Sequence, residues 1–198
     1  MIYNPKKPGG LLLFVGGVQW ILAVIVAEAR YQSYSVAQNF LSDLGVDHCS
    51  AFIFNGSTFL LGLLVIAATY LLRNEFGSRF FTFSLLLGGV GSLGVGIFNE
   101  THILIHSIFA IMAFVFGAAT AIAASRRVLK PPLSYFSIAL GAFSLLAFIL
   151  FLLGFQLVIG EGGIERMIVY PNTMGLVGLG GYLMASSLPP AASKTLVA

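Results

Sequence analysis

Two histidines, His102 and His106, are the residues whose types and spacing point most directly to chemistry. Their i, i+4 spacing places both imidazoles on one face of a helix, about 6 Å apart along its axis. Such a pair can hold one zinc ion if another segment supplies a third ligand, for which His48, Cys49 or an outer carboxylate is the candidate. Two histidines one turn apart cannot be the opposite axial ligands of one haem, so the spacing disfavours haem. Both residues also fit a purely structural role as hydrogen-bonding groups.

Further polar side chains flank the apolar runs and form the rest of the candidate site. Ser42 and Asp43 are suited to cap a short helix, and Asn55 and Asn99 each end an Ile-Phe-Asn tripeptide. Arg166 fits either a salt bridge with outer acids or a contact with a lipid phosphate. The full set of candidates is Asn39, Ser42, Asp43, Asn55, Asn99, Glu100, Glu165 and Arg166.

The composition indicates whether these residues belong to a soluble protein or to a membrane protein. The 198 residues are 58% hydrophobic and only 9% charged, whereas a soluble domain carries about 25% charged residues. The apolar runs are continuous rather than alternating, so they predict membrane-spanning helices and not a β-barrel. The net charge of +3 comes from basic residues scattered between the runs and does not indicate a nucleic-acid partner. We expect an all-α, multi-pass integral membrane protein of the cell membrane.

Six uncharged runs predict a six-helix transmembrane bundle that occupies residues 1–198 as a single domain. The predicted spans are residues 8–27, 50–72, 80–99, 103–125, 133–160 and 167–188. The fifth is longer than a bilayer requires, so it is expected to tilt or to project beyond the surface. The third is rich in glycine. Because small residues let helices approach closely in lipid, Gly91 and Gly94 are expected to face neighbouring helices.

The charged residues predict which side of the membrane each connection occupies. Six spans place both termini on one side, and only Arg30 and Arg166 of the 10 Lys and Arg residues fall on the other. Because cytoplasmic loops are rich in Lys and Arg, both termini are predicted in the cytoplasm. Glu75 is the one cytoplasmic acid, so the opposite face gathers the remaining acids and every histidine. Polar groups near hydrocarbon cost less free energy when they contact one another. The residues expected to converge on one outer pocket are Asp43, Asn99, Glu100, His102, His106, Glu165 and Arg166.

Four short segments together resemble the signature positions of one family. They are Asn39-Phe40-Leu41-Ser42-Asp43-Leu44-Gly45, Phe54-Asn55, Gly96-Ile97-Phe98-Asn99-Glu100 followed by His106, and Gly163-Ile164-Glu165-Arg166. The family consists of uncharacterised six-helix prokaryotic membrane proteins, mainly archaeal, that carry a domain-of-unknown-function label. The resemblance spans nearly the whole chain, and it implies a fold and a topology without an established activity.

A more distant similarity is to the alkaline ceramidase and adiponectin-receptor superfamily of seven-helix zinc amidohydrolases. Those proteins use a Ser, an Asp and three His, and the matching inventory here is Ser42, Asp43, His48, His102 and His106. The chain departs from that pattern because it has six predicted spans and lacks the two-histidine motif of a final helix.

Three functions are therefore compared. The first is a membrane protein that binds a lipid headgroup at its polar outer site, or that serves as an accessory subunit of a membrane complex. The alternative is a membrane-embedded zinc hydrolase of lipid amides or esters, in which His102, His106 and a third ligand hold the metal that activates water. A small transporter is a further alternative, and it is disfavoured because the middles of the spans carry almost no charge.

Overall fold

The computed structural model describes residues 4–155 and 157–186, and this part of the chain is helical, with no strand. The long helices are α1 (Lys6–Arg30), α2 (Ala51–Leu72), α3 (Arg79–Ile97), α4 (Ile103–Arg127), α5 (Leu133–Leu152) and α6 (Gly160–Ser186). Three short 3₁₀ helices lie in the connections: η1 (Ser42–Gly45), η2 (Glu100–His102) and η3 (Leu157–Ile159). The all-helical prediction is confirmed for these residues.

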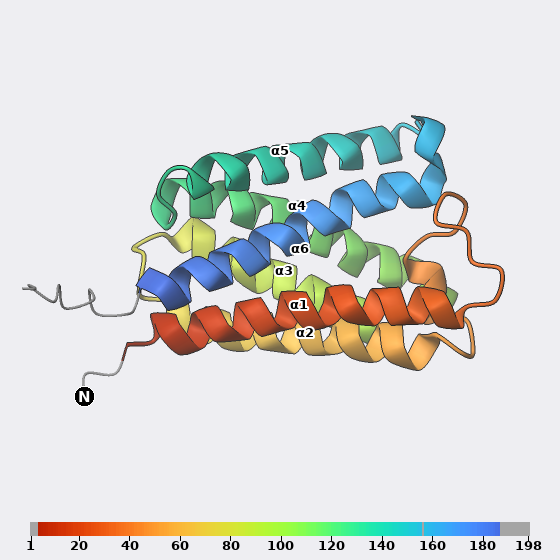
Figure 1. Cartoon of the computed structure of the whole chain (residues 1–198), viewed down its shortest axis with the longest axis horizontal. Helices are drawn as coiled ribbons and strands as arrows, with labels where there is room; N and C mark the ends of the chain where they lie inside the picture. The colour runs from red at the N-terminus through yellow and green to blue at the C-terminus, as the bar shows by residue number, and fades with distance from the viewer. Residues whose placement is uncertain (1–3, 156, 187–198) are drawn as a thin grey trace, which may run out of the picture.

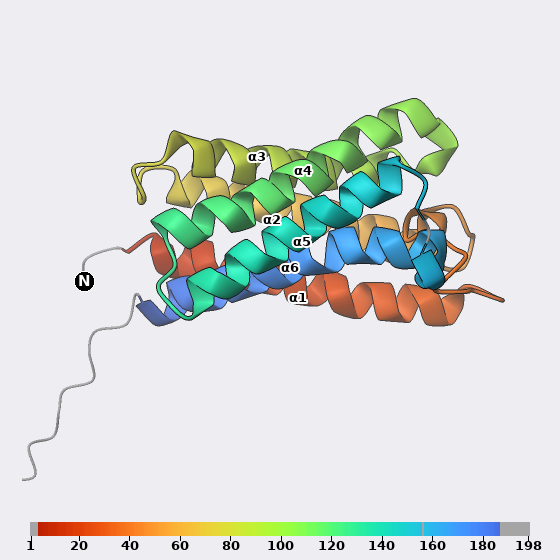
Figure 2. The ribbon, with the colours of Figure 1, turned by 90° about the horizontal axis from the view of Figure 1, so that it is seen from above.

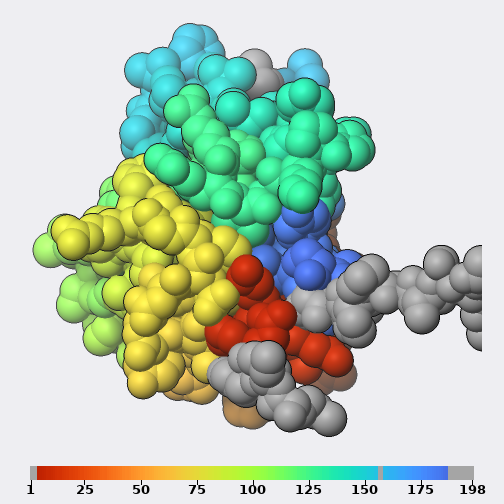
Figure 3. Space-filling view, turned by 90° about the vertical axis from the view of Figure 1, so that its left-hand side faces the viewer, coloured from red at the N-terminus to blue at the C-terminus, as the bar shows by residue number. Residues whose placement is uncertain are grey.

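The long helices alternate in direction, so their connections gather at the two ends of the bundle (Figure 1). The segments that join α1 to α2, α3 to α4, and α5 to α6 lie at one end, which we call the loop end. The start of α1, the end of α6 and the two remaining turns lie at the other end, the turn end, which Figure 3 faces. The basic residues that belong to the turn-end segments are Lys6, Lys7, Arg73, Arg79, Arg126, Arg127 and Lys130.

Five of the long helices form a closed ring. In this ring α1 packs against α2 and α6, α2 packs against α3, α3 packs against α4, and α4 meets α6. Among the long helices of the described part of the chain, α5 packs mainly against α4 and α6 and lies over them on the outside (Figure 2). All five ring helices line a central cavity, to which α5 contributes no residue. The ring therefore encloses the cavity, and α5 covers the outside of the ring at α4 and α6.

Helix α5 docks on the ring through a stripe of small residues. Ser137 donates a hydrogen bond of 2.7 Å to the carbonyl of Ala121 on α4, and Ser144 donates one of 2.8 Å to the carbonyl of Ile168 on α6. Between them, a Cβ on Gly141 would lie 2.8 Å from the carbonyl oxygen of Ala118. Because lipid provides no hydrophobic force between helices, close packing and hydroxyl bonds of this kind hold the outer helix in place.

Close contacts at glycine also join α2, α3 and α4. A Cβ added to Gly91 would lie 2.4 Å from the backbone nitrogen of Ala113 on α4, and one added to Gly94 would overlap the ring of Phe109. Both glycines are buried. The prediction that the glycine-rich third helix packs against its neighbours is therefore confirmed.

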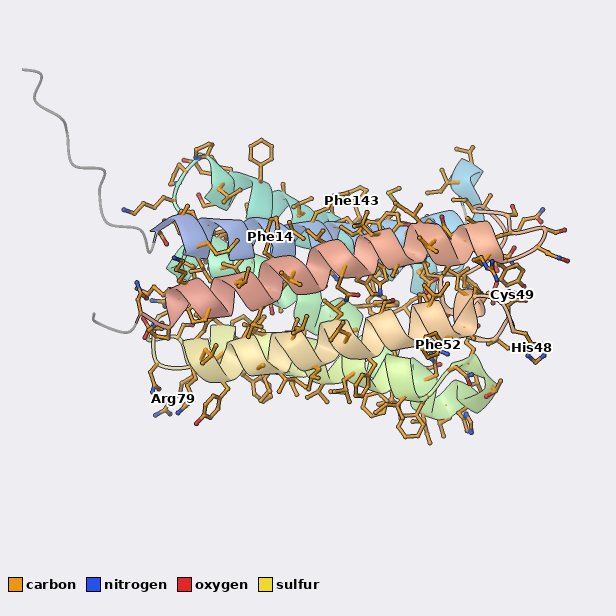
Figure 4. All side chains as sticks on the ribbon, turned by 60° about the horizontal axis from the view of Figure 1, so that its bottom comes forward. Phe14, His48, Cys49, Phe52, Arg79 and Phe143 are labelled. Atoms are coloured by element: carbon orange, nitrogen blue, oxygen red, sulfur yellow. The ribbon has the colours of Figure 1, made fainter. Side chains whose placement is uncertain are left out.

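The outer surface is apolar, as a membrane protein requires. Five helices are long and apolar enough to cross a membrane: α1, α2, α3, α4 with η2, and α5. Large apolar side chains stand on the outside, such as Phe52, which is 90% exposed, and Phe143 (Figure 4). Together these features indicate a membrane-embedded protein.

Helix α6 is not among the five, within the residues that the structure describes. Its first two turns carry Glu161, Glu165 and Arg166, and Pro171 and Asn172 interrupt the apolar sequence that follows. A sixth span is therefore not established by length and composition alone.

The helix boundaries differ from the predicted spans mainly between α5 and α6. Helix α5 ends at Leu152, well before the predicted limit at residue 160, because Gly154 has a positive φ of 73° and turns the chain. Helix α6 then begins at Gly160 rather than at residue 167. The predicted end of the last span at residue 188 and the basic residue Lys194 lie outside the described residues.

Candidate functional site

The loop end brings together three segments that are far apart in sequence. They are the α1–α2 connection with η1, the α3–α4 connection with η2, and the first turns of α6. Figure 4 shows this end with His48 and Cys49 labelled, opposite to the end that carries Arg79. Most of the predicted site residues lie on these segments.

A carboxylate cluster joins the first two segments. Asp43 accepts hydrogen bonds from the side-chain amide of Asn39 at 2.9 Å and from the backbone N–H of Phe40 at 3.0 Å. Ser42 donates a bond of 2.8 Å to Glu100, so η1 and η2 are tied directly. Asn39, Ser42, Asp43 and Glu100 are thus brought together at the loop end.

Glu165 connects this cluster to α6. Its side chain is buried and accepts a hydrogen bond of 2.5 Å from the backbone N–H of Leu41, next to Ser42. Glu165 precedes the apolar part of α6 that begins at Met167. Burial raises the pKa of Glu165 to about 7, and the charges of Glu100 and Asp43 raise it further, against the opposing effects of Leu41 N–H and Arg166. The burial of Glu165 therefore favours its neutral form.

Arg166, the next residue, belongs to a separate network. Its guanidinium forms a 2.8 Å ion pair with Glu28 at the end of α1 and a hydrogen bond with the hydroxyl of Tyr34. It also donates to the carbonyls of Val36 at 3.0 Å and Asn39 at 3.1 Å. Burial raises the pKa of the Tyr34 hydroxyl, which therefore stays neutral. Arg166 thus fastens the first loop to α6 through bonds within the protein.

Two glycines at the start of α6 allow this loop to approach. A Cβ on Gly162 would lie 2.0 Å from the carbonyl oxygen of Asn39, and one on Gly160 would lie 2.2 Å from that of Ala37. Gly162 also donates a backbone hydrogen bond of 3.1 Å to Ala37. Only glycine leaves room for the loop backbone here.

Asn55 and Asn99 share one acceptor. The side-chain amide of Asn55 donates a bond of 2.8 Å to the carbonyl of Gly45, and Asn99 donates one of 3.2 Å to the same oxygen. The two Ile-Phe-Asn segments therefore bind η1 from α2 and from the α3–α4 connection. Both asparagines organise the loop end beside the carboxylate cluster.

The three histidines are not brought together. His106 is buried, and its Nδ1 lies 2.8 Å from the carbonyl oxygen of Phe98. His102 is exposed and lies next to Thr101, and His48 is exposed on the α1–α2 connection. Within the described residues no three His, Cys, Asp or Glu side chains are placed to hold a metal ion. The residues present do not fit the zinc site that the histidine spacing suggested.

The polar residues lie at the loop end of a larger feature, a cavity of about 110 Å³ inside the helix ring, and we call this end of the cavity its mouth. Leu41, Ser42, His106 and Glu165 line it at the loop end, and the lining continues toward the turn end as far as Ala124. The distance from His106 to Ala124 along α4 is roughly 27 Å at 1.5 Å per residue. The α4 residues that line it between these two ends are mostly small: Ala110, Ala113, Phe114, Gly117, Thr120 and Ala121.

A family comparison places this arrangement among known sequences. A family model described as "Protein of unknown function (DUF998)" matches residues 14–182. The chain belongs to this family. The match runs from the first helix to the last, so the helix ring, its cavity and the loop end all lie within the DUF998 region. This confirms the resemblance to an uncharacterised family.

Searches of curated proteins and of solved structures found no match. The archaeal distribution and the distant ceramidase similarity that the sequence suggested receive no support from the DUF998 match.

Sequence reasoning missed several residues of the site. Glu28 and Tyr34 complete the Arg166 network, but nothing in their local sequence indicates a partner on α6. Asn172 lines the cavity in the middle of α6 and follows Pro171. An amide inside an apolar run was a visible signal, since such groups need partners in a membrane.

Proposed function

We propose that this chain is a six-span protein of the cell membrane, with both termini in the cytoplasm, that binds a membrane amphiphile inside its helix ring. The apolar chain of the ligand occupies the cavity, and its polar head lies at the loop end near Ser42, His106 and Glu165. The sequence predicts that a lipid headgroup binds at the outer face. The proposal adds that the apolar chain of the same ligand enters the helix bundle.

One observation carries the proposal: the cavity begins among buried polar side chains and continues between apolar ones. Its deeper part is lined by Leu61, Val65, Leu85 and Leu179, and its mouth by Ser42 and Glu165. Binding sites for small molecules combine apolar walls with a few placed polar groups in this way. An apolar void inside a packed bundle is costly unless a ligand fills it.

The topology supports the same orientation. The turn-end segments carry basic residues, whereas the loop end carries most of the acids, and cytoplasmic segments are the basic ones. The mouth of the cavity would then open toward the outer leaflet. Helix α6 would cross as the sixth span, with its polar residues sheltered within the ring and the loop end.

The test is to measure bound amphiphile directly. Protein extracted in mild detergent should carry one amphiphile per chain by native mass spectrometry. Ala110→Leu narrows the cavity and should reduce its occupancy about tenfold, because the added side chain takes the volume of the ligand chain. Ala119→Leu, on the same helix but outside the lining, is the matched control. Equal occupancy in both variants would contradict the proposal.

A further inference from the structure

We propose that the cavity selects an amphiphile whose polar groups donate hydrogen bonds, namely a single-chain alcohol or amine, over one whose polar groups only accept them. This inference rests on the proposed function and specifies the class of ligand. It follows from the state of each polar side chain in the lining.

The hydroxyl and indole donors of the lining are already used within the protein. Thr58 illustrates this: it donates to the carbonyl of Phe54 at 2.7 Å and accepts from the indole of Trp20 at 2.9 Å. Ser92, Thr120 and Thr173 each donate to a carbonyl of their own helix. Ser42 donates to Glu100. These hydroxyls therefore offer a ligand only the lone pairs of their oxygens.

His106 also offers a ligand in the cavity an acceptor and not a donor. A backbone carbonyl can only accept, so the 2.8 Å contact with Phe98 places a proton on Nδ1 of the ring. In the neutral imidazole the other nitrogen, Nε2, is then an acceptor. His106 thus adds an acceptor at the mouth of the cavity.

Asn172 provides the clearest acceptor. Its amide nitrogen donates to the carbonyl of Phe114 at 3.1 Å, which fixes the orientation of the amide. Its Oδ1 is buried and has no hydrogen-bond partner among the described residues. Apart from the second amide hydrogen of Asn172 and the proton of Glu165 when its carboxyl is neutral, the side-chain donors of the lining are used. An unmet buried acceptor favours a ligand that brings an N–H or O–H group.

The negative charge at the mouth also favours a ligand that donates hydrogen bonds. Glu165 lines the cavity and, once ionised, accepts hydrogen bonds, with Glu100 and Asp43 close by. None of the described lining residues is Lys or Arg. Arg166 already bonds Glu28 and the first loop. A phosphate or carboxylate head would therefore meet acceptors and negative charge.

The size of the cavity limits the ligand to one slender chain. A volume of about 110 Å³ is distributed along a lining that spans roughly 27 Å of α4. Because a compact cavity of about 150 Å³ holds benzene, this smaller and elongated space takes one short chain of roughly six carbons or fewer. Glu165 and Asn172 are two helical turns apart, roughly 10 Å, so donors at the head and farther down the chain would meet separate acceptors.

The experiment compares four probes that share one short chain: hexanol, hexylamine, methyl hexanoate and hexyl phosphate. The full chain in detergent at pH 8 is titrated with each, and the fluorescence of Trp20, the single tryptophan, reports binding from within the cavity. Hexanol and hexylamine should bind about tenfold more tightly than methyl hexanoate and hexyl phosphate. In Glu165→Gln, which adds a donor at the mouth, this preference should shrink. Glu161→Gln, exposed and outside the lining, should retain it.

The outcomes separate the two proposals. If methyl hexanoate or hexyl phosphate binds as tightly as hexanol, the donor preference is wrong while the proposed function stands. If all four probes leave Trp20 fluorescence unchanged, amphiphile binding itself is contradicted. A preference that is equal in Glu165→Gln and Glu161→Gln also overturns the assignment to this mouth.

Discussion

Arg166 illustrates how one buried cation organises the loop end. Its two terminal nitrogens bond Glu28, Tyr34 and the carbonyls of Val36 and Asn39, and the residue is only 4% exposed. The planar fork of a guanidinium suits several acceptors at once, which a single ammonium group does not. Because these nitrogens bond groups within the protein, they disfavour the suggested contact between Arg166 and a lipid phosphate. That contact stays a prediction.

Arg166→Lys should therefore loosen the first loop. The ammonium cannot replace the fork, so buried acceptors lose donors, and we expect a loss of about 2 kcal/mol in the free energy of unfolding. Limited proteolysis of residues 31–41 should become faster, and thermal unfolding in detergent should occur at lower temperature. Arg30→Lys, at an exposed position on α1, is the control. Equal proteolysis rates in both variants would show that Arg166 does not hold the loop.

At this scale the sequence predicted which residues belong to the polar end but not their partners. Glu165 and Arg166 stood out because charges beside an apolar run are conspicuous. The partner of Arg166 is Glu28, which lies 138 positions earlier, and local spacing cannot indicate such a pairing. The histidine pair shows the opposite error: the i, i+4 spacing is real, but His102 faces out while His106 turns inward.

Among the elements, α2 offers a matched test of close helix packing. A Cβ on Gly62 would lie 2.3 Å from the backbone nitrogen of Leu93 on α3, whereas a Cβ on Gly56 would meet nothing within 4 Å. Gly62→Ala should force the two helices apart and cost about 1–3 kcal/mol. Gly56→Ala should be neutral or slightly stabilising, because alanine favours the helix. Thermal unfolding followed by circular dichroism checks both, and equal transitions would refute the contact.

The helices themselves were predictable because a continuous apolar run has few alternatives in a membrane. The residues at which the helices end, and the helices that pack against one another, were less predictable. Residues 153–160 are largely apolar, yet Gly154 ends α5 through a positive φ that composition does not reveal. The small stripe on α5 predicts close packing, but only the assembled ring shows that α5 lies outside it.

For the whole molecule, the proposed topology makes a prediction about access from each side. Cys49, the single cysteine, is exposed at the loop end, so a membrane-impermeant maleimide should label it on intact cells. Asn74→Cys in a Cys49→Ser background places the thiol at the exposed α2–α3 turn and should react only after lysis. The reverse pattern would invert the topology.

The central claim concerns a ligand chain inside the ring, and photolabelling tests it most directly. A hexanol that carries a diazirine in its chain should crosslink to the inward face of α4, at Ala110, Ala113 and Gly117. Ile108 and Ile111 lie at similar depth on the same helix but are 52% and 45% exposed on its outer face. Peptide mapping that finds the label on the inward residues, and finds it displaced by unlabelled hexanol, is the predicted result. Label confined to Ile108 and Ile111 would contradict the account.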